Sequence, residues 1–170
     1  MSATLPGGQP SRMPSVEIIT ESPLWEAEPG IEATLKRAVS ETSAAIATAD
    51  VELAIVLTND ARIRALNHAW RGFDKPTNVL SFPAGDRGGA QGAPALLGDI
   101  VIAYETTKRE AQAQGTPFLH HLSHLTVHGF LHLRGYNHEA DDEAETMERL
   151  ERQILARLDI PDPYAARDAG

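Results

Sequence analysis

The chain has 170 residues, and 42% of them are hydrophobic, which suffices for one sizeable core but would make two domains cramped. It contains no cysteine, which excludes disulfide bonds and thiolate ligands and leaves imidazole and carboxylate groups to hold any metal, a set that favours zinc. The formal net charge of -9 argues against a protein that coats nucleic acid without specificity, but it is compatible with a local basic groove around Arg62, Arg64, Arg71 and Lys75.

The first 14 residues are rich in glycine, proline and serine and predict a disordered tail. They lack the apolar stretch that a secretory signal requires, and no later apolar run is long enough to cross a membrane. We therefore expect a cytoplasmic protein without a membrane partner. A single catalytic domain is predicted over residues 15–165, followed by a short C-terminal tail over residues 166–170.

Strands and helices alternate along the predicted domain. Segments rich in β-branched and aliphatic residues predict strands at 16–20, 51–57, 79–82 and 99–103. Apolar residues at helical spacing predict helices at 31–47, 104–114, 118–133 and 141–158, and a further helix that begins near Asp60 and carries Ile63 and Leu66. Residues 84–96, rich in glycine, alanine and proline, are expected to form a loop. The predicted fold class is α+β (α/β-type), with one small mixed sheet packed by about five helices.

Residues 127–139 (VHGFLHLRGYNHE) carry three histidines at the spacing of a zinc protease: His128, His132 and His138. Residues four apart share one face of a helix, so His128 and His132 can direct their rings at one point. Gly135 permits the chain to turn back at the helix end and bring His138 to the same point. Three neutral imidazoles leave zinc a fourth position for water, which is typical of a catalytic site, although another divalent metal would also fit.

Three other histidines precede this cluster on the same predicted helix. We expect His120 and His121 to be solvated. For His124 two interpretations stay open, one as a contact to substrate or to a metal ligand and the other as ordinary packing.

A zinc protease of this spacing has a glutamate directly after the first histidine, where this chain has Gly129. That glutamate takes a proton from the zinc-bound water and passes it to the leaving amine. Cleavage of a phosphodiester depends more on neutralising charge around phosphorus. The missing glutamate therefore favours a phosphate ester over a peptide as substrate.

Several motifs together resemble the YbeY family of metal-dependent endoribonucleases, which act in ribosomal RNA maturation. The matching segments cover most of the chain from about Val51 onward: RGFDKPTNVLSFP at 71–83, LGDIVIA at 97–103, HGFLHLRGYNH at 128–138, DDEAETMERLE at 141–151 and DPY at 162–164. The resemblance implies a small mixed sheet packed with helices, with the metal near a helix end.

The resemblance also implies that His128, His132 and His138 bind one zinc ion and that Arg71 is the functional arginine. A guanidinium group can bind phosphate through two hydrogen bonds and stabilise charge in the transition state. Lys75 is a further candidate for phosphate contact.

The general base is left open by the sequence. The family pattern reads GYDH before the last ligand, whereas this chain has Asn137 there, and an amide cannot act as a base at neutral pH. Asp99, Glu139 and Asp142 are candidates in its place, and Asp99 could equally brace the backbone.

The resemblance implies a single-strand-specific, zinc-dependent endoribonuclease that matures the 3′ end of small-subunit ribosomal RNA and acts in ribosome quality control. Its partners would be RNA, the small ribosomal subunit and assembly factors such as a GTPase. Attack by zinc-bound water and attack by the 2′-OH of the RNA both stay open. Two alternatives remain, a zinc peptidase of degenerate type and a non-catalytic ribosome assembly factor with a structural metal.

Overall fold

The computed structural model describes residues 13–48, 50–85 and 94–165. The predicted C-terminal tail and nearly all of the predicted N-terminal tail lie outside these ranges. Within them, no helix has both the length and the apolar character needed to pass through a lipid bilayer.

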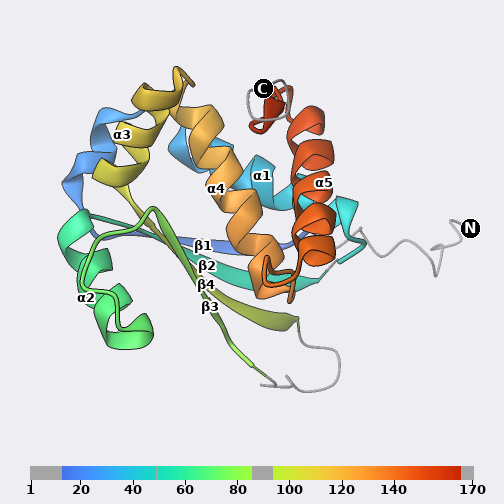
Figure 1. Ribbon diagram of the computed structural model, residues 1–170, viewed down its shortest axis with the longest axis horizontal. Helices are drawn as coiled ribbons and strands as arrows, with labels where there is room; N and C mark the ends of the chain where they lie inside the picture. The colour runs from blue at the N-terminus through green and yellow to red at the C-terminus, as the bar shows by residue number, and fades with distance from the viewer. Residues whose placement is uncertain (1–12, 49, 86–93, 166–170) are drawn as a thin grey trace, which may run out of the picture.

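The centre of the fold is a four-stranded mixed sheet in the order β1-β2-β4-β3 (Figure 1). The first three strands in this order are parallel, and β3 pairs antiparallel with β4 at one edge. The strands are β1 (Ser15–Thr20), β2 (Val51–Thr58), β3 (Val79–Pro83) and β4 (Ala95–Ala103). This sheet confirms the predicted α+β class.

Five α-helices surround the sheet, as predicted, with ends close to the expected positions. They are α1 (Ile31–Ala45), α2 (Asp60–Arg71), α3 (Tyr104–Gln114), α4 (Phe118–Leu133) and α5 (Asp141–Arg157). The helix α5 packs on α1 and α4 rather than on the sheet itself. A short 3-10 helix, η1 (Pro23–Ala27), was not expected, because five residues are too few for helical periodicity to be visible. It buries Trp25, whose indole N–H donates to the Thr58 carbonyl at 2.8 Å.

The two faces of the sheet are covered unequally. On one face, side chains of β2 and β4 such as Ile55 and Ile100 pack against Leu35 of α1 and Leu122 of α4. On the other face a smaller cluster joins α2 to β3 and β4, made of Ile63, Leu80, Val101 and Ala103. Successive residues of a strand point to opposite faces, so Ile100 and Val101 belong to different layers. The helix α4 thus lies over the larger core.

The prediction of a loop over residues 84–96 was wrong at its end, because β4 begins at Ala95. Ala95 and Leu96 pair with Val51 and Glu52 of β2, before the register shifts between Glu52 and Leu53. Strand pairing between distant segments decides this boundary, whereas the nearby glycines and proline weaken the local strand signal. Residues 86–93 of the predicted loop lie outside the described residues.

Candidate active site

The C-terminal end of α4 brings three histidines together. The helix carries His128 and His132 four residues apart on a half-exposed stripe. It ends in a turn at Gly135, where φ is 92° and the N–H groups of Gly135 and Tyr136 donate to the carbonyls of His132 and Leu131. This left-handed conformation favours glycine, and it reverses the chain so that His138 returns to the helix end.

The three imidazoles form a compact cluster of possible metal ligands. One ligand atom from each of His128, His132 and His138 lies within 4.8 Å of the others. The Nε2 atoms of His128 and His132 are 2.9 Å apart. The structure therefore assembles the predicted histidine triad at the helix end.

Hydrogen bonds on the far side of two rings fix which nitrogen carries the proton. Nδ1 of His132 donates to the Tyr136 carbonyl at 2.9 Å, and Nδ1 of His128 donates to Oε1 of Glu151 at 2.6 Å. Both partners are acceptors, so in the neutral rings the two Nε2 atoms carry lone pairs. Two lone pairs facing one another fit a bound cation, and neutral imidazole is a ligand that zinc prefers.

The burial of His132 supports the same protonation state. Burial is the largest cause that lowers the pKa of His132, to about 4, although its hydrogen bond to Tyr136 acts in the opposite direction. The ring is therefore neutral near pH 7 and ready to bind a metal ion.

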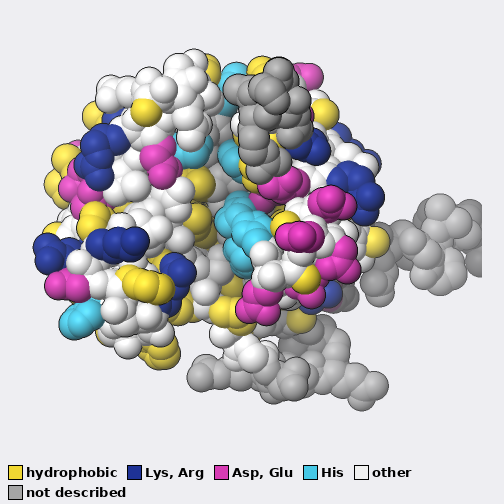
Figure 2. Space-filling model, in the orientation of Figure 1, with side chains coloured by type: hydrophobic (Ala, Val, Ile, Leu, Met, Phe, Trp, Pro, Cys, Tyr) yellow, Lys and Arg dark blue, Asp and Glu magenta, His cyan; other side chains and the backbone are white. Residues whose placement is uncertain are grey.

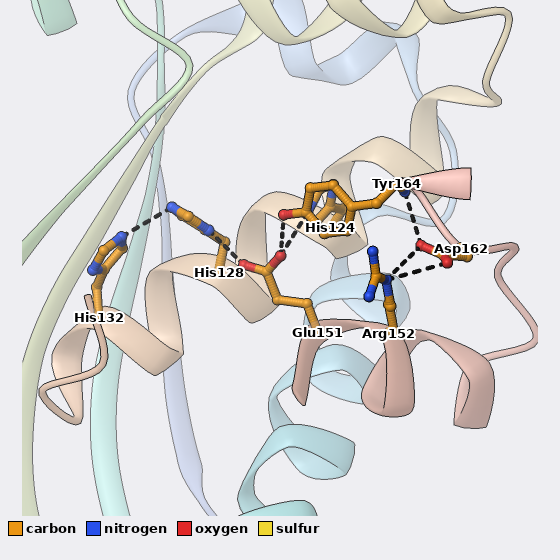
Figure 3. A network of polar contacts seen from close by, with 7 residues as sticks. All are labelled: His124, His128, His132, Glu151, Arg152, Asp162 and Tyr164. Carbon is orange, nitrogen blue, oxygen red and sulfur yellow. Dashed lines mark hydrogen bonds and ion pairs between the residues drawn. The ribbon is translucent and has the colours of Figure 1, made fainter. Parts of the chain in front are cut away.

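A carboxylate from α5, that of Glu151, lies between His124 and His128, at the ring nitrogen of His128 that faces away from His132 (Figure 3). The Glu151 side chain is fully buried and accepts hydrogen bonds from His128, from His124 and from the Tyr164 hydroxyl. Burial alone would raise the pKa of Glu151, but the hydrogen bonds from His124 and His128 hold it well below its usual range. The sequence reasoning missed Glu151, although an acid four residues after the buried Met147, on the apolar stripe of the helix, was a signal for it.

The other histidines of α4 do not join the triad. Nε2 of His124 lies 3.2 Å from Glu151, so His124 contacts the carboxylate that supports His128. The expectation that His121 is solvated was wrong, because its ring is buried and Nε2 lies 2.8 Å from Oε1 of Glu110. His120 is half-buried.

A basic hollow lies at the end of α2. Arg71 and Lys75 are exposed, and their charged groups lie 5.3 and 5.6 Å from the centre of the Phe73 ring. The hollow has a volume of about 390 Å³ and is also lined by Asn78 and Glu110. Figure 2 shows Lys and Arg side chains on the α2 side of this face, with the histidines across a depression from them.

The loop that carries Lys75 is held in place by two side-chain amides. Asn67 of α2 donates to the Lys75 carbonyl at 2.9 Å, and Asn78 donates to Oε1 of Glu110 at 2.9 Å. Glu110 also contacts His121, so one carboxylate connects the loop to α3 and α4. Burial would raise the pKa of Glu110, but its hydrogen bonds from His121 and Asn78 lower it overall. Sequence reasoning did not single out Glu110.

Asp99 is not brought to the histidines. Its neighbour Ile100 faces α4, where it lies against Gly129. Asp99 points to the opposite face of the sheet and lines a separate groove with Trp70 and Phe82.

Gly129 has a packing reason of its own. A Cβ atom at this position would lie 2.9 Å from Cγ2 of Ile100 and 3.2 Å from Oγ of Ser81. The Ser81 hydroxyl donates to the Gly129 carbonyl at 3.0 Å. The helix thus approaches β3 and β4 so closely that any side chain here, including the glutamate of a protease, would require a neighbour to shift.

Asn137 braces the turn that carries His138. Its Oδ1 accepts the backbone N–H of Glu139 at 3.1 Å. This contact needs only an acceptor, which an amide provides as well as a carboxylate does.

A family model described as endoribonuclease YbeY matches residues 20–159. The chain belongs to the YbeY family. The endoribonuclease YbeY of Nitrobacter hamburgensis is 59% identical over 162 residues, covering 92% of this chain and 85% of the relative. That of Rhodopseudomonas palustris (strain BisA53) is 56% identical over 159 residues, covering 91% of this chain and 92% of the relative.

The fold also has a counterpart among solved structures. The solution structure of a protein from Thermotoga maritima superposes with a TM-score of 0.51 at 23% identity, covering 84% of this chain and 91% of that protein. At this identity the likeness supports the fold alone.

Proposed function

We propose that this YbeY-family chain is a zinc-dependent endoribonuclease that cleaves single-stranded RNA. The observation that carries the proposal is the histidine triad, in which two Nε2 atoms lie 2.9 Å apart, on the same face of the molecule as a basic hollow (Figure 2). His128, His132 and His138 would hold one ion. Relatives named endoribonuclease YbeY support the same reaction.

The chain's own residues would bind and orient the phosphodiester. When bound, a divalent ion supplies positive charge that polarises a phosphate oxygen. Arg71 would bind another phosphate oxygen through hydrogen bonds from its planar guanidinium group, and the ammonium group of Lys75 would add a positive charge near the phosphate. Phe73, exposed between these two cations, offers a surface on which a base of single-stranded RNA can stack.

Either route of attack, by water or by the 2′-OH of the RNA, requires a general base that removes the proton from the attacking oxygen. Asp99 is a poor candidate because it lines the groove on the other face of the sheet. Attack by the 2′-OH of the RNA breaks the bond to the 5′ oxygen and leaves a 2′,3′-cyclic phosphate. Attack by water leaves a linear phosphate instead.

We further propose that the RNA is ribosomal and that the enzyme acts in the cytoplasm. In this role it would mature the 3′ end of the small-subunit RNA and take part in ribosome quality control. It would work on the small subunit together with assembly factors such as a GTPase. Membership of the YbeY family supports this role, which implies that the natural substrate is bound within a ribonucleoprotein.

The peptidase alternative lacks its proton-transferring residue. Gly129 stands where that glutamate would be, and a side chain at this position would require Ile100 or Ser81 to shift. The second alternative is a non-catalytic assembly factor with a structural metal. The RNA cleavage experiment described next distinguishes it from the enzyme.

The test is cleavage of a single-stranded RNA and of a duplex of the same sequence by the zinc-loaded protein, with and without a chelator, followed by mapping of product ends. We expect cleavage of the single strand only and its loss with chelator. A protein that binds zinc but cleaves neither RNA would be the non-catalytic assembly factor. Cyclic phosphate ends would identify the 2′-OH as the main nucleophile.

A further inference from the structure

Glu151 is a buried carboxylate that contacts His128, one of the three candidate metal ligands, at Nδ1. It lies on α5, 23 residues after His128, and its side chain is fully buried. Oε1 accepts Nδ1–H of His128 at 2.6 Å, while Oε2 lies 3.2 Å from Nε2 of His124 and accepts the Tyr164 hydroxyl. Both carboxylate oxygens are therefore occupied by donors.

Stability alone does not account for a charge in this position. Removing an ionised carboxylate from water costs several kcal/mol, and buried ion pairs are often replaced by apolar residues without loss of stability. Glu151 occupies the apolar stripe of α5, next to Met147 and Leu155, where a leucine or methionine would pack. A carboxylate there is explained by what it does to His128.

Its effect on the ring follows from hydrogen-bond chemistry. A carboxylate can only accept, so it keeps the proton of His128 on Nδ1 and leaves the lone pair on Nε2. The bond also fixes the ring plane, with Nε2 directed at His132. Metal-binding histidines depend on such partners for tautomer, orientation and basicity.

A segment after α5 holds the carboxylate in turn. Tyr164 N–H donates to Oδ1 of Asp162 at 2.8 Å, and Arg152 pairs with Asp162 at 3.2 Å. The Arg152 guanidinium group lies 5.4 Å from the centre of the Tyr164 ring. These contacts hold the Tyr164 hydroxyl against the Glu151 carboxylate (Figure 3). The DPY segment therefore supports the carboxylate that contacts His128.

We propose that Glu151 is a positioning residue of the metal centre, which sets the tautomer and direction of His128, while Tyr164 and His124 hold the Glu151 carboxylate. The inference rests on the proposed metal site. It assigns His124 to the support of a ligand and not to substrate contact.

The test measures the zinc dissociation constant of the full chain by competition with a chelator. Glu151→Gln keeps the shape and removes the charge, and we expect zinc to bind roughly 10- to 100-fold more weakly, the range typical for loss of such a partner. Glu145→Gln is the matched control, since Glu145 is exposed on the same helix, and its affinity should equal that of the wild type. Tyr164→Phe should weaken binding in the same direction but less.

A second readout separates positioning from general loosening. Long-range proton–nitrogen NMR spectra of the metal-free protein report the tautomer of His128. We expect the Nδ1–H form in the wild type and a shift toward the Nε2–H form in Glu151→Gln, because the new amide can donate to Nδ1.

The outcomes are distinguishable. If the wild type binds no zinc, the metal site itself is refuted. If the wild type binds zinc and Glu151→Gln binds it equally tightly with the same tautomer, the role of Glu151 is refuted. Should Glu151→Gln fail to fold, Tyr164→Phe decides, and unchanged zinc affinity in that variant counts against the proposal.

Discussion

The Nε2 atoms of His128 and His132 lie 2.9 Å apart, and the other nitrogen of each ring faces an oxygen acceptor. In the neutral rings this arrangement sets two lone pairs against each other. A cation coordinated by both would remove the repulsion, so binding should stabilise the folded state.

We therefore expect zinc to raise the melting temperature of the chelator-treated protein. At a free concentration of about 100 times the dissociation constant, binding adds about 2.7 kcal/mol, which corresponds to roughly 5–10 °C for a chain of this size. His132→Ala should lose this shift, whereas His68→Ala, at an exposed histidine of α2, should keep it. Differential scanning calorimetry measures the effect, and an equal shift in His132→Ala would contradict it.

Arg71 should matter for the rate of RNA cleavage and not for metal binding. Removing a group that stabilises charge in the transition state typically costs about 100- to 1,000-fold in rate, and we expect Arg71→Ala to fall in this range. Arg71→Lys should recover only part, because an ammonium group cannot form paired hydrogen bonds.

Arg62→Ala is the control for charge, since Arg62 lies on the same helix but lines the groove with Trp70 and Asp99. Single-turnover cleavage at equal zinc loading compares these variants. Equal rates for Arg71→Ala and Arg62→Ala would remove Arg71 from the mechanism.

Gly129→Glu, which restores the protease pattern, should destabilise the fold without creating a peptidase. Overpacking a core typically costs about 1–3 kcal/mol, and even the Cβ of Gly129→Ala would meet Cγ2 of Ile100 at 2.9 Å. The free energy of unfolding from urea titration should fall in Gly129→Ala and fall further in Gly129→Glu.

A double-mutant cycle locates the cause. Ile100→Ala removes the contacting methyl group, so its cost should be smaller in the Gly129→Ala background than in the wild type. Strictly additive effects would show that another contact is responsible.

The carboxylate of Glu110 should make a pH-dependent contribution to stability. Because its pKa is lowered below 4.5 in the folded chain, the ionised form stabilises the fold above that pH, and the contribution is lost as the pH falls through the folded pKa. The difference in unfolding free energy between wild type and Glu110→Gln should shrink as the pH falls below about 4.5. A difference that grows toward acid pH would contradict this sign.

Much of the fold was predictable because its signals are local. Eleven residues of α4 are buried, and β2 is rich in aliphatic residues over its whole length. The turn at Gly135 was also predictable, because glycine readily adopts the positive φ that the turn needs. These features depend on neighbours within a few positions.

The parts that sequence reasoning missed depend on distant partners. His121 is buried against Glu110, 11 residues away, and Glu151 meets His128 across 23 residues. No periodic pattern in the sequence predicts either contact. The direction of the Asp99 side chain was predictable, because successive residues of a strand point to opposite faces of the sheet. Its neighbour Ile100 points to the face that α4 covers, so Asp99 points to the other face.

The most direct test of the central claim is a zinc titration of the metal-free protein, with the rate of single-stranded RNA cleavage measured at each step. The account predicts that cleavage rises in proportion to bound zinc, reaches its maximum at one ion per chain, and is absent from His132→Ala at the same zinc concentrations. Cleavage by the metal-free protein at the full rate, or by His132→Ala at the wild-type rate, would contradict it.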